Sequence, residues 1–242
     1  MVLCLAVGGE RPARAAGATS QPVTAPASRP TSGPEKWESV IQRFEQNDKV
    51  SPVPAGATVF VGSSTIAGWG SIPDDFKRFN AVGRGFGGST SADVLHYVDR
   101  IVIDYKPSKV VYYAGDNDIA AGVSPPKVLE NFQAFVEKVR AATPNVKIYF
   151  VSIKPSPIRA KVWDQARQAN EAIRRYVRKT PGLMYVDCAT PMLDQDGKAR
   201  PELFKKDMLH MNRGGYELWI PIITAALEQD MPATAPGGDD RP

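Results

Sequence analysis

The sequence has few cysteines, few histidines and no long apolar run. Its 242 residues include two cysteines, Cys4 and Cys188, and two histidines, His96 and His210. Removal of an N-terminal leader would leave Cys188 alone, which excludes an intrachain disulfide. No apolar run approaches the roughly 20 residues that a membrane-spanning helix needs, so we expect no membrane span. The scarcity of histidine leaves few candidates for a metal ligand or a general base.

A strong excess of one charge is also missing. The 30 Lys and Arg are balanced by 26 Asp and Glu, the net charge is +4, and basic residues are interspersed along the chain. The longest basic groups are pairs such as Arg174-Arg175 and Lys205-Lys206. Because nucleic-acid binding needs a clustered basic surface, we expect no nucleic-acid partner.

The two ends of the chain differ from the middle. In residues 1–16 the apolar run MVLCLAVGG and the small-residue site Ala13-Arg14-Ala15 resemble the end of a secretory signal peptide, although no basic segment precedes the run. Residues 17–35 are rich in Pro, Ser, Thr and Ala and predict a disordered linker, and residues 232–242 predict a disordered tail. We therefore expect an exported protein, periplasmic or extracellular, with one domain over residues 36–231; the alternative location is the cytoplasm.

Within that domain, apolar strands alternate with amphipathic helices. Strands are predicted at TVFVG, FNAVGRGF, VVYYAG, VKIYFVSI and LMYVD. Helices are predicted at SADVLHYVDRIVIDY, PPKVLENFQAFVEKVRAAT, RAKVWDQARQANEAIRRYVRKT and GGYELWIPIITAALEQDM. This alternation predicts an α/β fold, a three-layer αβα sandwich with helices on both faces of a mostly parallel sheet.

Polar loops follow the predicted strands or precede the last helix. They read Gly62-Ser63-Ser64-Thr65, Gly85-Phe86-Gly87-Gly88-Ser89-Thr90, Gly115-Asp116-Asn117-Asp118 and Asp207-Met208-Leu209-His210. Because the carboxyl ends of parallel strands meet at one edge of a sheet, we expect these loops to form one site.

These loops contain the parts of a nucleophilic site. A serine hydroxyl is a weak nucleophile until a base takes its proton, and histidine is the usual base. His96 falls on a predicted helix and is expected to be structural, so His210 is the candidate base. Asp207 precedes His210 by three residues and can accept a hydrogen bond from its other ring nitrogen. Taken alone, Asp207 is equally compatible with a turn cap, and serines after a strand are ordinary turn residues.

In order and spacing, the four loops resemble the sequence blocks of the SGNH, or GDSL-type, hydrolases over roughly residues 57–228. The spellings GSS, RGFGG and DND look most like the platelet-activating-factor acetylhydrolase-like bacterial branch. The resemblance implies a flavodoxin-like sheet and a catalytic triad of Ser64, Asp207 and His210. Ser63 stands where the family usually has an aspartate.

The same resemblance implies an oxyanion hole. Its donors would be the backbone N–H groups of Ser64 and Gly88 and the side-chain amide of Asn117. Taken alone, Gly88 is compatible with an ordinary turn glycine and Asn117 with an Asx turn. The Gly115–Asp118 loop also admits a metal site, but such sites recruit several ligands and His210 is the one histidine left. We expect no metal and no cofactor.

The activity implied by the resemblance is serine-dependent carboxylic ester hydrolysis through an acyl-enzyme. No lid-like apolar insertion separates the four loops, which favours a short, acetyl-like acyl group. The substrate is expected to be a small-molecule ester or a carbohydrate ester. Trp69 and Trp163 are candidate pocket walls, although tryptophans at such places more often pack in the core or at the rim. A lysophospholipase or thioesterase of the same family is the alternative, and a non-catalytic binding module with the same fold is the alternative of another class. The sequence predicts nothing about oligomeric state.

Overall fold

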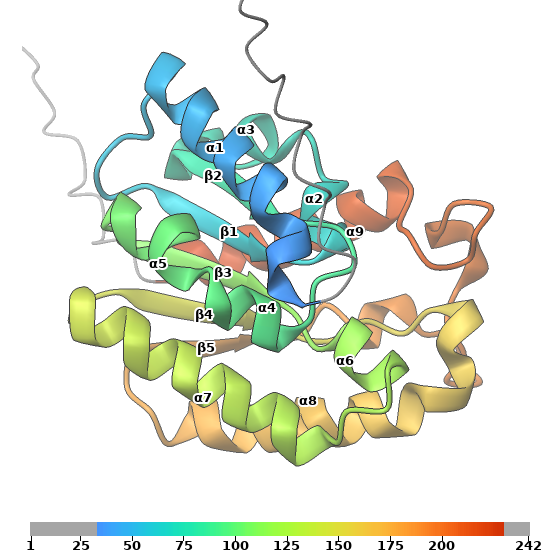
Figure 1. The fold of residues 1–242 in the computed structure, drawn as a ribbon. Helices are drawn as coiled ribbons and strands as arrows, with labels where there is room; N and C mark the ends of the chain where they lie inside the picture. The colour runs from blue at the N-terminus through green and yellow to red at the C-terminus, as the bar shows by residue number, and fades with distance from the viewer. Residues whose placement is uncertain (1–32, 230–242) are drawn as a thin grey trace, which may run out of the picture.

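The computed structural model describes residues 33–229 (Figure 1). Three predicted segments lie outside these residues: the leader at 1–16, the tail at 232–242 and, of the linker at 17–35, all but its last three residues. The described chain opens with a 3-10 helix, η1 (Pro34–Trp37), that leads into α1 (Glu38–Val50). In this part of the chain, no helix combines the length and the apolar character needed to cross a membrane.

Five parallel strands form one sheet in the order β2-β1-β3-β4-β5. The strands are β1 (Thr58–Gly62), β2 (Ala81–Gly85), β3 (Lys109–Tyr113), β4 (Lys147–Val151) and β5 (Leu183–Val186). This order is that of flavodoxin-like sheets. The predicted three-layer α/β fold is therefore confirmed, and the sheet of the described residues is parallel throughout.

Helices connect the strands. They are α2 (Ser64–Ala67), α3 (Ile72–Asp75), α4 (Ser91–His96), α5 (Val98–Ile101), α6 (Asp116–Ala120), α7 (Pro125–Ala142) and α8 (Trp163–Arg178). The helix α9 (Arg213–Glu228) follows the last strand. Further 3-10 helices are η2 (Lys77–Phe79), η3 (Ile103–Tyr105), η4 (Pro157–Val162), η5 (Thr190–Met192) and η6 (Pro201–Leu203).

One predicted helix is broken. The segment SADVLHYVDRIVIDY forms α4, α5 and η3, and the first break comes at Tyr97. The segment is rich in β-branched residues, whose stiff side chains disfavour a continuous helix. His96 ends α4 with an exposed side chain that contacts the ring of Tyr97 edge-on.

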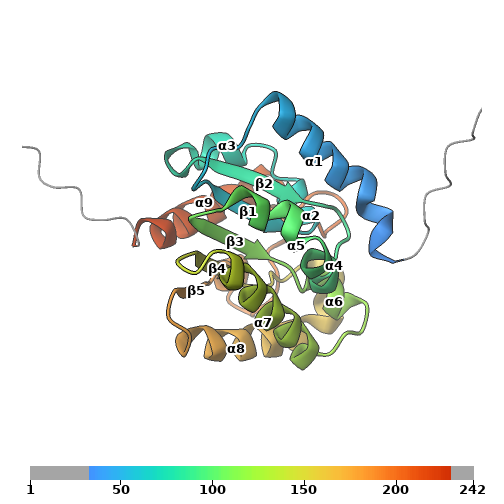
Figure 2. The same cartoon turned by 60° about the vertical axis from the view of Figure 1, so that its left-hand side comes forward.

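Alternate strand residues pack against opposite helical layers, as the pleat of a strand requires. In β1, Val59 and Val61 belong to one buried cluster, which includes residues of α1, α4, α5, α7 and α8, whereas Phe60 belongs to the other. The second cluster includes residues of α2, α3 and α9, among them the fully buried Trp219. Figure 1 shows α9 behind the sheet and α4, α5 and α7 in front of it, and Figure 2 shows the same sandwich turned by 60°.

The sheet changes winding direction between β1 and β3, because β2 lies on one side of β1 and β3 on the other. Ligands of open α/β sheets bind at such a point, beyond the carboxyl ends of the strands. Gly62 ends β1 there, and a Cβ at Gly62 would lie 1.9 Å from the carbonyl oxygen of Tyr113. The same oxygen accepts a hydrogen bond from the backbone N–H of Ser63 at 3.2 Å. Only glycine permits this close approach of β1 to β3.

Candidate active site

Asp207 and His210 form a hydrogen-bonded pair. Nδ1 of His210 lies 2.7 Å from Oδ2 of Asp207, and Oδ1 of Asp207 accepts from the backbone N–H groups of Leu209 and His210 at 3.0 and 2.9 Å. The bond from the His210 ring, followed by the two backbone bonds, holds the pKa of Asp207 well below its usual range. The ionised carboxylate only accepts, so the ring proton of neutral His210 sits on Nδ1 and Nε2 is a free acceptor.

The turn that carries this pair is fixed from both sides. The backbone N–H of Lys205 donates to the carbonyl of His210 at 2.7 Å, and Met208 adopts a left-handed conformation with φ of 55°. On the other side, Asn212 caps α9 by accepting from the N–H of Gly215 at 3.1 Å. Because α9 packs on the sheet, this cap fixes the turn relative to the strand ends.

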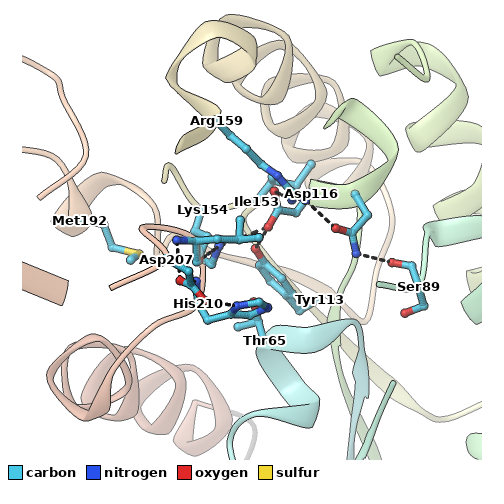
Figure 3. Close-up of polar contacts among 12 residues, drawn as sticks. Thr65, Ser89, Tyr113, Asp116, Ile153, Lys154, Arg159, Met192, Asp207 and His210 are labelled. Carbon is cyan, nitrogen blue, oxygen red and sulfur yellow. Dashed lines mark hydrogen bonds and ion pairs between the residues drawn. The ribbon is translucent and has the colours of Figure 1, made fainter. Parts of the chain in front are cut away.

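Ser64 begins α2 directly after β1. A Cβ on Gly87 would lie 3.8 Å from Cβ of Ser64, so the serine lies beside the loop that follows β2. The carbonyl of the next residue, Thr65, accepts from the hydroxyl of Tyr216 at 3.0 Å, which ties α2 to α9, and the His210 ring lies near Thr65 in Figure 3. Among residues 33–229, no hydrogen bond joins the Ser64 hydroxyl to His210. The structure brings the two segments to one edge without joining their side chains.

The three predicted oxyanion donors lie at the start of α2, in the loop after β2 and in the first turn of α6. Nδ2 of Asn117 donates to the carbonyl of Ser89 at 2.8 Å, and a primary amide has a second N–H to donate. The backbone N–H groups of Ser64 and Gly88 have no acceptor within the described part of the chain. Gly88 has a φ of 79°, and an added Cβ would meet the Trp37 ring only at 3.4 Å. The left-handed backbone, rather than crowding by the protein, therefore favours glycine here.

A buried charge cluster behind Asn117 was not predicted from the sequence. Nζ of Lys154 lies 3.2 Å from Oδ2 of Asp116, and the guanidinium of Arg159 bonds Oδ1 of Asp116 and, at 2.8 Å, Oδ1 of Asn117 (Figure 3). Burial pushes the pKa of Asp116 upward, but Lys154 and Arg159 outweigh it and hold the pKa below its usual value. The only sequence signal was a lysine directly after the apolar run VKIYFVSI.

The other carboxylate of this loop has different partners. Asp118 accepts from the backbone N–H of Ser91 at 2.9 Å and from its hydroxyl, and Asn131 donates to that hydroxyl at 2.8 Å. Burial raises the pKa of Asp118. Over residues 33–229, no three His, Cys, Asp or Glu side chains converge as metal ligands. The carboxylates of the Gly115–Asp118 loop are thus bonded to donors of the protein itself.

The two tryptophans proposed as pocket walls differ. Trp69 is 2% exposed and packs against Phe60, Phe76 and Tyr216 in the core, so it has the core role that was its alternative and is no pocket wall. Trp163 lines a groove of about 480 Å³ between segments 155–163 and 194–201.

Comparisons with known proteins give the family and the fold of the chain. The model of the GDSL-like lipase/acylhydrolase family matches residues 60–218. A GDSL-like lipase from Bacteroides thetaiotaomicron is 26% identical, with a TM-score of 0.69 over 79% of this chain and 98% of that one. A presumed acylhydrolase from Bacteroides fragilis is 26% identical, with a TM-score of 0.68 over 78% and 95%. A carbohydrate esterase of family 3 from Talaromyces cellulolyticus is 18% identical and shares the fold, with a TM-score of 0.56 over 72% and 97%. Among curated proteins, none matches.

Proposed function

The chain belongs to the GDSL-like lipase/acylhydrolase family and is an ester-hydrolysing enzyme, and from this premise we propose that it cleaves short-acyl, acetyl-like esters through an acyl-enzyme on Ser64. One observation carries the proposal. It is the 2.7 Å hydrogen bond between His210 and Asp207, which leaves a basic ring nitrogen at the sheet edge where Ser64 begins α2.

In the proposed reaction, Nε2 of His210 takes the proton of the Ser64 hydroxyl while Oγ attacks the ester carbonyl carbon. The resulting oxyanion accepts hydrogen bonds from the N–H groups of Ser64 and Gly88 and from the Asn117 amide. Collapse of this intermediate breaks the bond to the alcohol, which leaves with the proton from His210. Water then attacks the acyl-serine by the same route and releases the carboxylic acid.

Asp207 has a supporting part in this scheme. Its pKa is held below the usual range by the hydrogen bond from His210, so the ionised carboxylate stabilises the imidazolium that forms in each half-reaction.

The choice of a short acyl group rests on the loops. The four site loops are joined by compact elements, and no long apolar insertion interrupts them in the described residues. An acetylated carbohydrate is the proposed natural substrate, supported by the shared fold of the carbohydrate esterase and by the groove that Trp163 lines.

The test measures release of p-nitrophenol from acetate, butyrate and octanoate esters by wild type, Ser64→Ala and Ser63→Ala. Ser63→Ala is the matched control, because it removes a hydroxyl one residue away. We expect the acetate ester to be cleaved fastest, Ser64→Ala to lose at least about 10³-fold in kcat, and Ser63→Ala to retain activity. Equal rates for wild type and Ser64→Ala would overturn the proposed nucleophile. A preference for octanoate would overturn the short-acyl assignment. Measurement of acetate release from acetylated xylan tests whether the enzyme accepts an acetylated carbohydrate as its substrate.

A further inference from the structure

The segment between β4 and α8 contacts the Asn117 loop through Arg159. Nη1 of the guanidinium donates to Oδ1 of Asp116, and Nη2 donates to Oδ1 of Asn117 at 2.8 Å. The Arg159 side chain is 20% exposed, and the Asp116 side chain that anchors it is 10% exposed. A planar guanidinium can make both bonds at once because its donors form a rigid fork.

The same segment contacts the loop of the base. Nζ of Lys154 donates to the carbonyl of Leu209 at 3.0 Å, and the backbone N–H of Ile158 donates to the carbonyl of Met208 at 3.3 Å. Asp116 joins the two sets of contacts, because its carboxylate accepts from both Lys154 and Arg159. Figure 3 shows these side chains converging between His210 and Ser89.

The Asn117 carboxamide is held at both ends. Its Oδ1 accepts from Arg159 and its Nδ2 donates to the carbonyl of Ser89 at 2.8 Å. Rotating the amide by 180° would place Oδ1 against the Ser89 carbonyl and the NH₂ group against the guanidinium, so two acceptors and two donor groups would face each other. The hydrogen bond from Arg159 is thus one of the two interactions that keep the amide in its present orientation.

We propose that Arg159 is a positioning residue for ester hydrolysis. Its hydrogen bond fixes the Asn117 carboxamide so that the second N–H of Nδ2 stays directed at the oxyanion. The inference rests on the proposed function, since it assigns Arg159 a part in the oxyanion hole. It differs from a purely structural role, in which Arg159 would serve only as a counter-charge for Asp116.

The two roles predict different kinetics. An oxyanion donor acts in the transition state more than in the ground state, so Arg159→Met is expected to lower kcat with little change in KM. Loss of a whole donor costs about 10²–10³-fold, and loss of its orientation is expected to cost about 10–100-fold. Arg159→Lys keeps the charge beside Asp116 but cannot bond both partners, so it is expected to restore stability without restoring kcat.

The experiment is a double-mutant cycle on p-nitrophenyl acetate hydrolysis with Arg159→Met, Asn117→Ala and both together. If Arg159 acts through Asn117, then Arg159→Met changes kcat by less than about twofold in the Asn117→Ala background. Arg167→Met is the matched control, because within residues 33–229 the guanidinium of Arg167 bonds only the exposed Asp164 on α8. We expect this control to retain wild-type kcat.

Several results would overturn the inference. These are a wild-type kcat for Arg159→Met, full additivity with Asn117→Ala, or recovery of kcat by Arg159→Lys. Full activity of Ser64→Ala would instead refute the proposed function, so the two failures are distinguishable. If Arg159→Met does not fold, Arg159→Lys, alone and with Asn117→Ala, completes the cycle.

Discussion

Gly62→Ala is expected to separate the carboxyl ends of β1 and β3. The new Cβ would lie 1.9 Å from the carbonyl oxygen of Tyr113 and 3.2 Å from Cγ1 of Ile66. Real carbon–oxygen contacts are about 3 Å or longer, so the two strands must part by about 1 Å. Rotation of the Ile66 side chain can relieve the second contact but not the first, because the carbonyl oxygen of Tyr113 belongs to the backbone.

The energetic cost has two parts. Overpacking of this kind costs about 1–3 kcal/mol. The displacement also breaks the bond from the N–H of Ser63 to the same carbonyl oxygen, 3.2 Å in the native protein, which adds about 1 kcal/mol. We therefore expect the free energy of unfolding to fall by about 2–4 kcal/mol. Because Ser64 follows this contact, a 1 Å displacement is expected to lower kcat by about 10²-fold.

Urea denaturation followed by circular dichroism measures the first effect, and p-nitrophenyl acetate hydrolysis the second. Gly70→Ala is the matched control, because a Cβ at the exposed Gly70 meets no atom within 4 Å. It is expected to change stability by less than about 0.5 kcal/mol. A Gly62→Ala variant as stable and as active as Gly70→Ala would refute the reasoning.

Two further substitutions test individual carboxylates. Asp207→Asn keeps an oxygen for the backbone N–H groups of its turn but no longer provides a carboxylate for His210. We therefore expect kcat to fall about 10²–10⁴-fold with little change in Tm. A variant with more than a tenth of wild-type activity would contradict this role. The hydrogen bond from Arg213 outweighs the effect of burial and lowers the pKa of Asp75 from 3.8 to about 2. The ionised Asp75 therefore stabilises the folded protein above pH 4, and this stabilisation is lost as the pH falls toward 2. The Tm deficit of Asp75→Asn should therefore be largest near neutral pH and shrink below pH 4, and a deficit that does not vary with pH would contradict this.

The strands and the local parts of the site could be predicted from the sequence. Continuous apolar runs such as VVYYAG are typical of strands buried on both faces, and all five predicted strands are present. The Asp207–His210 bond was predictable because the two residues lie within one turn. Loops that follow parallel strands meet at one edge whatever their sequence, so the convergence of the other site loops followed from topology.

The charge cluster was not predictable, because its members come from distant parts of the chain. Lys154 and Asp116 are separated by 38 positions, and Lys154 reaches Leu209 across 55. Nothing near Lys154 in the sequence says which loop it contacts. Trp69 shows the same limit. A tryptophan shortly after Ser64 has the same sequence context whether it lines a pocket or lies in the core, and its contact with Trp219 of α9 is visible only in the structure.

The position of α9 at the end of the described chain sets the order in which the parts of the molecule are synthesised. A ribosome makes all five strands and Ser64 before it makes His210 and α9. Until α9 emerges, the sheet face covered by Trp219 and Leu227 stays open to water. A nascent chain therefore exposes this apolar face until α9 emerges, and His210, the proposed base, is made only three residues before that helix begins.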